Sequence, residues 1–365
     1  MRMPLLLQKG TMDAVGRFSP LTMSINLKAE PPSSATMTLH KDDISVSVSD
    51  WVQVFAPNGE MFVAVVRSVQ TDYFTGIRTV NMEHTFSLLS DDVIIGKTTF
   101  SETQNIKTVI SSLLSHQSHN YWDDGQVDFT AGQPWEFNNT DILSALDTLT
   151  DSVQDWTWTF DQTTLPWRVN LVRMPTVPTC EMRLTRNMTG MTVNVDKSGM
   201  YTRVYPVGKS NMMIDKTLPD GTVVHYLERN VDRYGVISKV LTDQSYRDKT
   251  SLENYGAAQL RRNCTPIVTI SIKGVLLSEL TGEPLDSLKI NTVCRVPLPD
   301  YGDTFDERIT ELSWADCIKD EMSVQVSLAN ERQTMTNIIK KQSSATKKAR
   351  TTSGCHLEED EKHVE

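Results

Sequence analysis

The sequence lacks the cysteine patterns that define zinc ribbons and dithiol redox motifs. Its five cysteines are widely spaced, and none has a partner at CxxC spacing. Four of them lie in apolar, strand-like contexts and are expected to be small buried hydrophobic side chains. This usage is typical of a chain that folds in a reducing cytoplasm. The cysteines are Cys180, Cys264, Cys294, Cys317 and Cys355.

Long hydrophobic runs are missing as well. No stretch approaches the roughly 18 consecutive apolar residues of a transmembrane helix. The apolar run near the N-terminus, residues 5–7, is too short for the core of a signal peptide. We therefore expect a soluble protein with no membrane-spanning segment and no visible export signal.

Positive charge is scarce. The chain has 36 Lys and Arg against 46 Asp and Glu, a formal net charge of −10. A duplex-binding surface requires a basic face, so specific DNA binding is disfavoured. A channel through which DNA passes without sticking remains compatible with this charge. The length of 365 residues allows two or three domains, and 39% hydrophobic with 22% charged residues is ordinary for a globular protein.

Established catalytic motifs are absent too, because the sequence has no GxSxG, HExxH or GxxxxGK[ST] pattern. Four weaker groupings lack support as sites. The pair His116 and His119 has no third metal ligand, and the pair Cys355 and His356 lies in a polar tail. The acidic loop of Asp300, Asp303, Asp306 and Glu307 departs from EF-hand spacing, and Glu83 with His84 is interpreted as a surface pair. We therefore predict no catalytic, cofactor-binding or metal-binding residues, and no cofactor.

The first part of the chain has the alternating pattern of β-strands. Alternation predicts strands over 35–40, 44–48 and 77–84. Residues 51–55 and 61–66 flank the turn signal Pro57-Asn58-Gly59 and predict a hairpin. Short strands at this spacing favour a sandwich or barrel, and we predict a first β domain over residues 1–97.

Residues 98–176 predict a small α/β domain. Ser101 is a candidate helix cap, followed by an apolar stripe at helical spacing, and a second helix is expected to start near Asn139-Thr140. The stripes are Ile106, Val109, Ile110, Leu113 and Leu114, then Ile142, Leu146, Leu149 and Val153. Residues 156–160 and 167–172 predict a hairpin whose tryptophans either form a ligand platform or, as we favour, pack in the core.

The central stretch, residues 201–209, predicts a strand in which Pro206 lies at an edge or a kink and Gly208 permits a turn. A turn at 219–221 and a helix from Thr250-Ser251 to just before Thr265-Pro266 follow. Further strands are expected at 267–272, 292–296, 309–314 and 322–328. We predict a second β domain with a helix over 177–332, and a polar, flexible tail over 333–365.

This central stretch, Thr202-Arg203-Val204-Tyr205-Pro206-Val207-Gly208-Lys209, resembles the TRLYPYGK motif of bacteriophage tail hub proteins, with valines replacing the usual Leu and Tyr. Four other segments resemble that family in the same order along the chain. They are Asp50–Phe55 through Gly59, Thr79–His84 through Leu89, Asp141–Phe160, and Leu280–Glu283. The resemblance covers roughly residues 35–330.

The resemblance implies a mainly β (α+β) fold with two tail-tube-like antiparallel β-barrel or sandwich domains and an inserted α/β domain. It also implies a homotrimeric, pseudo-sixfold ring at the virion tail tip, assembled in the host bacterial cytoplasm. Such a hub contacts the tail tube or distal tail protein, the tape-measure protein and the central fibre or spike. DNA passes through its lumen without specific binding.

Two alternatives stay open at this point. One is a tail-associated peptidoglycan endopeptidase, which requires a nucleophile or zinc site that the sequence does not display. The other is a β-rich glycan- or receptor-binding protein that uses Trp156, Trp158 and Trp167. Many relatives continue into a fibre or hydrolase domain, whereas this sequence stops at Glu365, which favours a bare hub.

Overall fold

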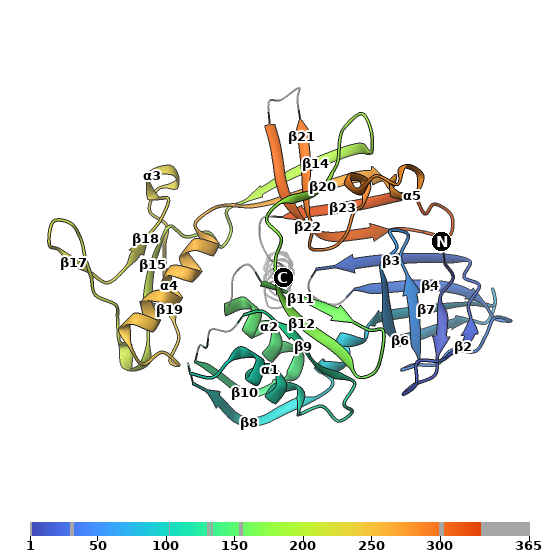
Figure 1. Ribbon diagram of the computed structural model, residues 1–365, viewed down its shortest axis with the longest axis horizontal. Coiled ribbons are helices and arrows are strands. Elements are labelled where there is room, and N and C mark those ends of the chain that lie inside the picture. Colours follow the sequence, from blue (N-terminus) through green and yellow to red (C-terminus); the bar gives the residue numbers. More distant parts are fainter. Residues whose placement is uncertain are drawn as a thin grey trace, which may run out of the picture.

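The structure is a computed structural model that describes residues 2–29, 33–101, 103–129, 132, 134–152, 156–298 and 303–329. It is mainly β, with helices in the inserted part and in the segment 201–264, and the short α5 Ser278–Thr281 apart from both (Figure 1). No helix within these ranges is long and apolar enough to cross a membrane. The tail predicted over 333–365, with Cys355 and His356, lies outside the described residues, as do Asp300 and Val153.

One sheet of thirteen strands unites the two β regions. The link is the antiparallel pair of β3 and β22, in which Leu27 lies opposite Leu312. Both regions bury their apolar faces in a shared core. The N-terminal strands are β1 Leu5–Leu7, β2 Ala14–Arg17, β3 Thr22–Lys28, β4 Ser34–His40, β5 Trp51–Phe55, β6 Met61–Asp72 and β7 Ile77–His84; the others are β13 Pro178–Glu181, β14 Met188–Asp196, β20 Ile267–Val275, β21 Val293–Leu298, β22 Asp303–Trp314 and β23 Ser323–Ala329.

The mainly β prediction is confirmed, with two local differences. The strand predicted over 44–48 is wrong, because this segment is irregular. At its start, Arg78 Nη2 donates to the carbonyl of Ile44 (3.0 Å) and to that of the preceding Asp43 (2.8 Å). Conversely, β1, β2 and β3 form in residues 5–28, for which no strand was predicted.

The inserted part places two helices between a two-stranded sheet, β8 with β10, and the three-stranded sheet of β9, β11 and β12 (Figure 1). The elements are η1 Thr85–Ser90, β8 Val93–Phe100, α1 Ile106–Leu114, β9 Trp122–Val127, β10 Trp135–Asp141, α2 Ile142–Ser152, β11 Trp156–Asp161 and β12 Trp167–Arg173. The apolar stripe of α1 is buried as predicted. Its cap is Asn105 rather than Ser101, since Asn105 Oδ1 accepts from Lys107 N at 2.9 Å.

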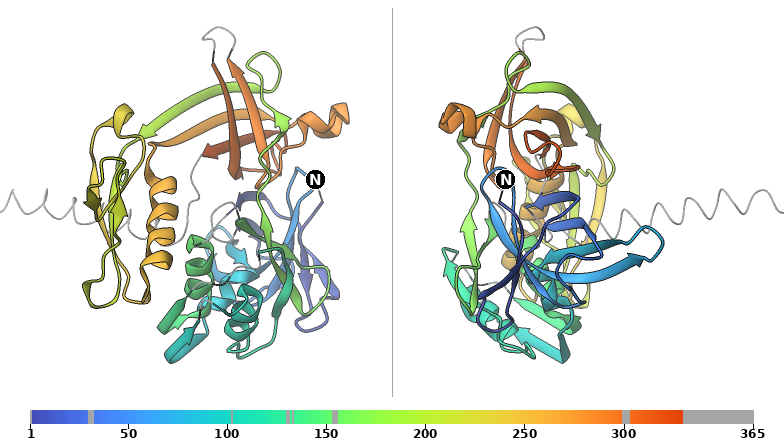
Figure 2. Two further views of the ribbon diagram at one scale, coloured as in Figure 1. Left: turned by 60° about the vertical axis from the view of Figure 1, so that its left-hand side comes forward. Right: turned by 90° about the vertical axis from the view of Figure 1, so that its right-hand side faces the viewer.

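Residues 201–264 form a module with a core of its own. Figure 2 shows it set apart from the large sheet and reached by the β14–β20 ribbon. Its elements are β15 Arg203–Val207, η2 Lys209–Asn211, β16 Lys216–Thr217, β17 Val223–Val224, β18 Leu227–Glu228, α3 Val231–Tyr234, β19 Ser238–Thr242 and α4 Lys249–Asn263; α5 Ser278–Thr281 and η3 Pro284–Asp286 lie outside it. The cap of α4 is Asp248, whose Oδ1 accepts from Ser251 N at 2.8 Å.

The central strand β15 lies beneath helix α4 in this module. The neighbouring strand β18 pairs only with Arg203 and Val204, so at Pro206 the strand is flanked by β19 alone. This agrees with the edge position predicted for the proline. Helix and strand approach closely at Gly256, where an added Cβ would lie 2.4 Å from Pro206 Cγ. The central motif is therefore a packing element of this module.

Candidate functional site

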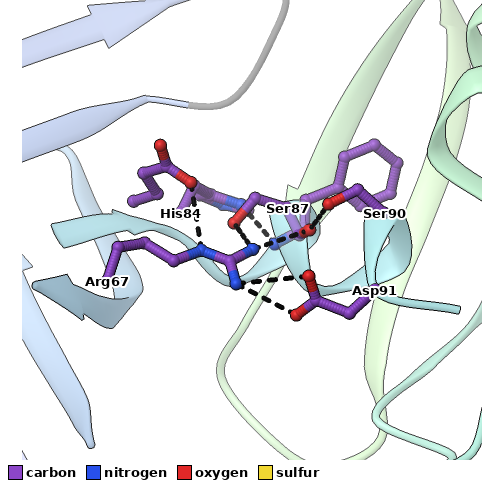
Figure 3. Close-up of polar contacts among 7 residues, drawn as sticks. Arg67, His84, Ser87, Ser90 and Asp91 are labelled. Carbon is purple, nitrogen blue, oxygen red and sulfur yellow. Dashed lines mark hydrogen bonds and ion pairs between the residues drawn. The ribbon is translucent and has the colours of Figure 1, made fainter. Parts of the chain in front are cut away.

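The densest polar cluster lies where β7 leads into the inserted part (Figure 3). Arg67, from β6, donates through Nε to Glu83 Oε2 at 3.1 Å and through Nη1 to Asp91 Oδ2 at 3.0 Å. Its Nη2 donates to both the carbonyl and the hydroxyl of Ser87 at 2.9 Å. Ser90 Oγ donates to the same carbonyl at 2.7 Å. One guanidinium thus ties together β6, β7 and both ends of η1.

His84 lies on the opposite side of β7 from this ion pair and is 4% exposed. Its Nδ1 accepts from Phe86 N at 3.0 Å and so caps η1. The ring lies 5.8 Å from those of Phe62 and Trp122 and 4.7 Å from that of Phe160. Burial among these rings lowers the pKa of His84 from 6.5 to about 3. The imidazole is therefore a neutral core side chain.

The interpretation of Glu83 and His84 as a surface pair is thus wrong for the histidine. The alternation of the strand would have predicted a buried histidine, because His84 lies on the same buried face of β7 as Val80 and Met82. Glu83 is the outward residue between them and pairs with Arg67.

A buried glutamine completes the contact between the large sheet and the inserted part. Gln162 Oε1 accepts from Val63 N at 2.8 Å, and its Nε2 donates to Val63 O at 3.2 Å and to Thr85 Oγ1 at 2.6 Å. The side-chain amide thus bonds the backbone N–H and C=O of Val63 at the edge of β6, as a neighbouring strand would. Its own oxygen and nitrogen both have hydrogen-bond partners. Arg67, His84 and Gln162 hold the inserted part rigidly against the large sheet.

The other weighed residues also have structural partners. His116 Nδ1 lies 2.9 Å from the carbonyl of Ser112, and His119 stacks on Tyr121 with ring centroids 5.2 Å apart. In the part of the chain that the structure describes, no three His, Cys, Asp or Glu residues converge as metal ligands would.

The acidic loop is divided between different environments. Asp306 forms a bidentate pair with Arg295, at 2.9 and 2.8 Å. Burial raises the pKa of Glu307. Of the remaining two, the side chain of Asp303 and all of Asp300 fall outside the described atoms.

The tryptophans pack in the core, as favoured from the sequence. Trp158 and Trp167 are 2% and 0% exposed. Trp156 is half-buried and packs edge-on against Phe129 at 5.4 Å. A glycan platform requires exposed ring faces, so this arrangement contradicts that use of the three residues.

The central motif also makes internal contacts. Arg203 pairs with Glu228, and its guanidinium lies 4.2 Å from the centroid of the Tyr226 ring. At Gly208, an added Cβ would lie 2.9 Å from both Met212 Cε and the carbonyl oxygen of Tyr246. The motif therefore specifies the fold of the 201–264 module.

The surface offers edges and one aromatic tip. Among the described strands, β14 pairs only with β20, β2 only with β1 and β13 only with β21, so the large, branched sheet has free edges at all three. Val193 and Val195 on β14 and Val15 on β2 are exposed. At the tip of the β6–β7 hairpin, Tyr73 and Phe74 are 90% and 104% exposed.

A shallow hollow of about 440 Å³ crosses neighbouring strands of the large sheet. Its wall is rich in hydroxyl and amide side chains, among them Ser24, Asn26, Thr36, Ser313 and Gln325. These polar side chains continue onto β7, where Asn81 Oδ1 accepts from Thr36 Oγ1 of β4 at 2.9 Å. This face of the sheet is polar but carries few cations.

Comparison with known proteins identifies the class. Residues 178–339 match the family model described as prophage endopeptidase tail. No curated protein matches the sequence. Three solved structures are similar over nearly their whole length, and the chain therefore has the fold of phage tail proteins.

The first is prophage tail protein gp18 from Listeria monocytogenes EGD-e, at 14% identity and a TM-score of 0.59, covering 94% of this chain and 99% of that one. The second is the tail protein from Neisseria meningitidis MC58, at 10% identity and 0.63, covering 90% and 96%. The third is the 43 kDa tail protein of prophage MuSo2 from Shewanella oneidensis, at 11% and 0.60, covering 91% and 98%. The resemblance to phage tail proteins is confirmed.

Proposed function

We propose that the protein is a structural hub of a phage tail tip, in which three copies form a ring that extends or closes the tail tube. In this proposal the ring contacts the tail tube or distal tail protein and the tape-measure protein, and it joins the tube to the central fibre or spike. The proposed domains are 1–97, 98–176 and 177–332, followed by the tail. The location is the virion, after assembly in the host cytoplasm.

The observation that carries the proposal is the single large sheet, whose free edges include two different strands, β14 and β2. A closed ring uses head-to-tail contacts, in which one surface of a subunit meets a different surface of the next. Unpaired backbone groups on an edge strand are ready partners for another strand. The nine-residue edge of β14, with exposed Val193 and Val195, and the β2 edge, with exposed Val15, supply two such surfaces.

The polar face of the sheet supports a DNA path through the ring. Proteins hold DNA chiefly through Lys and Arg that displace counterions from phosphates. Hydroxyls and amides such as those of Ser24, Asn26 and Gln325 give a wettable wall without that attraction. The net charge of −10 acts in the same direction. We propose that this face lines the lumen and that DNA passes it without specific binding.

We propose a structural rather than an enzymatic role. The support is positive: each candidate group with described contacts already has a structural partner. His84 caps η1 by accepting from Phe86 N, and Asp306 pairs with Arg295. A catalytic base or metal ligand needs its lone pair available to substrate or metal.

The test is the native mass of the purified full-length protein and of an edge variant, measured by light scattering at micromolar concentrations. The variant carries Val193→Lys and Val195→Lys, since charges on an edge block strand pairing. Val223→Lys, on an exposed valine of the separate module, is the matched control. We expect a trimer for the wild type and the control, and a monomer for the edge variant. A trimer that tolerates both edge lysines would refute the role of β14, and a monomeric wild type that cleaves peptidoglycan would favour the endopeptidase.

A further inference from the structure

Two cysteines lie directly opposite each other in neighbouring strands of the large sheet. The parallel pairing of β13 with β21 places Cys180 opposite Cys294. Paired residues of adjacent strands project to the same face, and adjacent strands lie about 4.8 Å apart. Both side chains belong to the shared core, at 1% and 0% exposure. Both are thiols in this structure.

This separation suits a covalent bond between them. A disulfide joins residues whose Cα atoms lie roughly 4.4 to 6.8 Å apart, a range that includes the spacing of paired strands. The pairing is irregular between Pro178 and Cys180, which gives the backbone room to adjust. Cys180 Sγ has only long contacts elsewhere, at 3.6 Å to Val293 O and 3.8 Å to Thr292 Oγ1.

The other described cysteines do not share this arrangement. Cys264 lies in the separate core of the 201–264 module. Cys317 donates to the carbonyl of Met23 at 3.0 Å, at the far side of the β3–β22 junction. The thiol pair is thus a specific feature of the β13–β21 contact.

We propose that Cys180 and Cys294 form an intramolecular disulfide when the folded protein meets a small-molecule disulfide such as oxidised glutathione. In the first step a sulfur of the pair attacks glutathione disulfide, forming a mixed disulfide and releasing one glutathione thiolate. The second cysteine then displaces the second glutathione. The protein thiols lose two electrons and two protons, and one glutathione disulfide becomes two glutathione thiols.

Cys180 is the attacking group. The neighbouring Cys294 thiol lowers the pKa of Cys180, whereas the same contact and burial raise the pKa of Cys294. The thiolate is the nucleophile, and the sulfur on the strand that opens first therefore reacts first. Access requires local opening of β13, which has four residues and pairs only with β21 among the described strands. Short edge elements of this kind open at low cost.

The bond would close residues 181–293 into a loop. That segment contains β14, the whole 201–264 module and β20. A disulfide around a long loop restricts the unfolded chain and so raises the free energy of unfolding. The chain would fold with free thiols in a reducing compartment and acquire the bond in an oxidising one. This inference concerns the thiols alone and does not depend on the proposed ring.

The test treats the purified full-length protein with oxidised glutathione, blocks remaining thiols with N-ethylmaleimide under denaturing conditions, and maps peptides by mass spectrometry. We expect two of the five thiols to escape alkylation and one linked peptide pair containing Cys180 and Cys294. Cys294→Ser should lose the link and trap glutathione on Cys180. Cys264→Ser, the matched control on another buried cysteine, should keep the link.

The wild-type experiment stands even if the serine variant fails to fold. A urea-unfolded sample treated in parallel shows that the oxidant is active. If the folded protein keeps five alkylatable thiols while the unfolded chain is oxidised, the proposal is overturned. A folded protein whose links involve other cysteines overturns it equally.

Discussion

Acidification should destabilise the protein through His84. The pKa of this imidazole falls from 6.5 to about 3 on folding because the ring is buried. Between those values the unfolded state binds more protons than the folded state, so stability falls as pH falls. The contribution is fully present above pH 6.5 and is lost progressively toward pH 3.

The size of this effect follows from the shift. Each pH unit below the unfolded pKa removes about 1.4 kcal/mol. Lowering the pH from 7.5 to 5 should therefore reduce the free energy of unfolding by about 2 kcal/mol through this one group. The 4% exposure of His84 leaves little solvent to weaken the effect.

The assay compares the wild type with His84→Asn by urea unfolding at a series of pH values. Asn retains an acceptor for Phe86 N but does not titrate in this range. Tryptophan fluorescence, to which Trp122 beside the imidazole contributes with the six other tryptophans, reports unfolding. His40→Asn, on a histidine whose side chain is 52% exposed, is the control and should follow the wild type. If wild type and His84→Asn lose stability in parallel between pH 7.5 and 5, the buried neutral histidine is refuted.

Three further outcomes are expected. Gly256→Ala should lower the free energy of unfolding by about 1–3 kcal/mol, because its methyl group meets Pro206 at 2.4 Å; Pro206→Ala in the same chain should recover part of this loss in calorimetric melts. Arg67→Lys should cost about 1–2 kcal/mol in urea unfolding, since an ammonium cannot reproduce the planar fork that bonds Glu83, Ser87 and Asp91. Replacing both Tyr73 and Phe74 with Ser should leave melting unchanged yet weaken particle assembly, measured by sedimentation.

Each of these has a matched control and a contradicting result. Gly190→Ala has open space around its added Cβ and should leave the free energy of unfolding unchanged. If Gly256→Ala also leaves it unchanged, the close contact between α4 and Pro206 is refuted. Arg168→Lys, on a more exposed arginine, should lower the free energy of unfolding only slightly. If both arginine changes lower it equally, the stabilising role of the Arg67 contacts is refuted. The tip prediction fails if the Ser variant assembles like a Val48→Ser variant, which alters an isolated exposed apolar side chain.

Local patterns in the sequence were sufficient for most of the secondary structure. The hairpin around Gly59 and the strand at 77–84 form as predicted, because their alternation and turn chemistry agree with their final burial. The helices at 106–114 and 142–152 form for the same reason, since their apolar stripes face one core.

What the sequence did not reveal depends on contacts between distant segments. The antiparallel junction of β3 with β22 joins residues nearly three hundred positions apart, and neither strand alone indicates it. The segment 44–48, predicted as a strand, is irregular and begins at a carbonyl, that of Ile44, which accepts from the distant Arg78. The pairing of Cys180 with Cys294 likewise requires the register of two strands that are distant in sequence.

The ring itself is the central claim, and electron microscopy of the purified full-length protein tests it most directly. We predict class averages with threefold symmetry around an open or plugged centre, in which the large sheets of neighbouring subunits meet at their edges. Particles of single, separate subunits at concentrations where the native mass has reached its plateau would contradict the account.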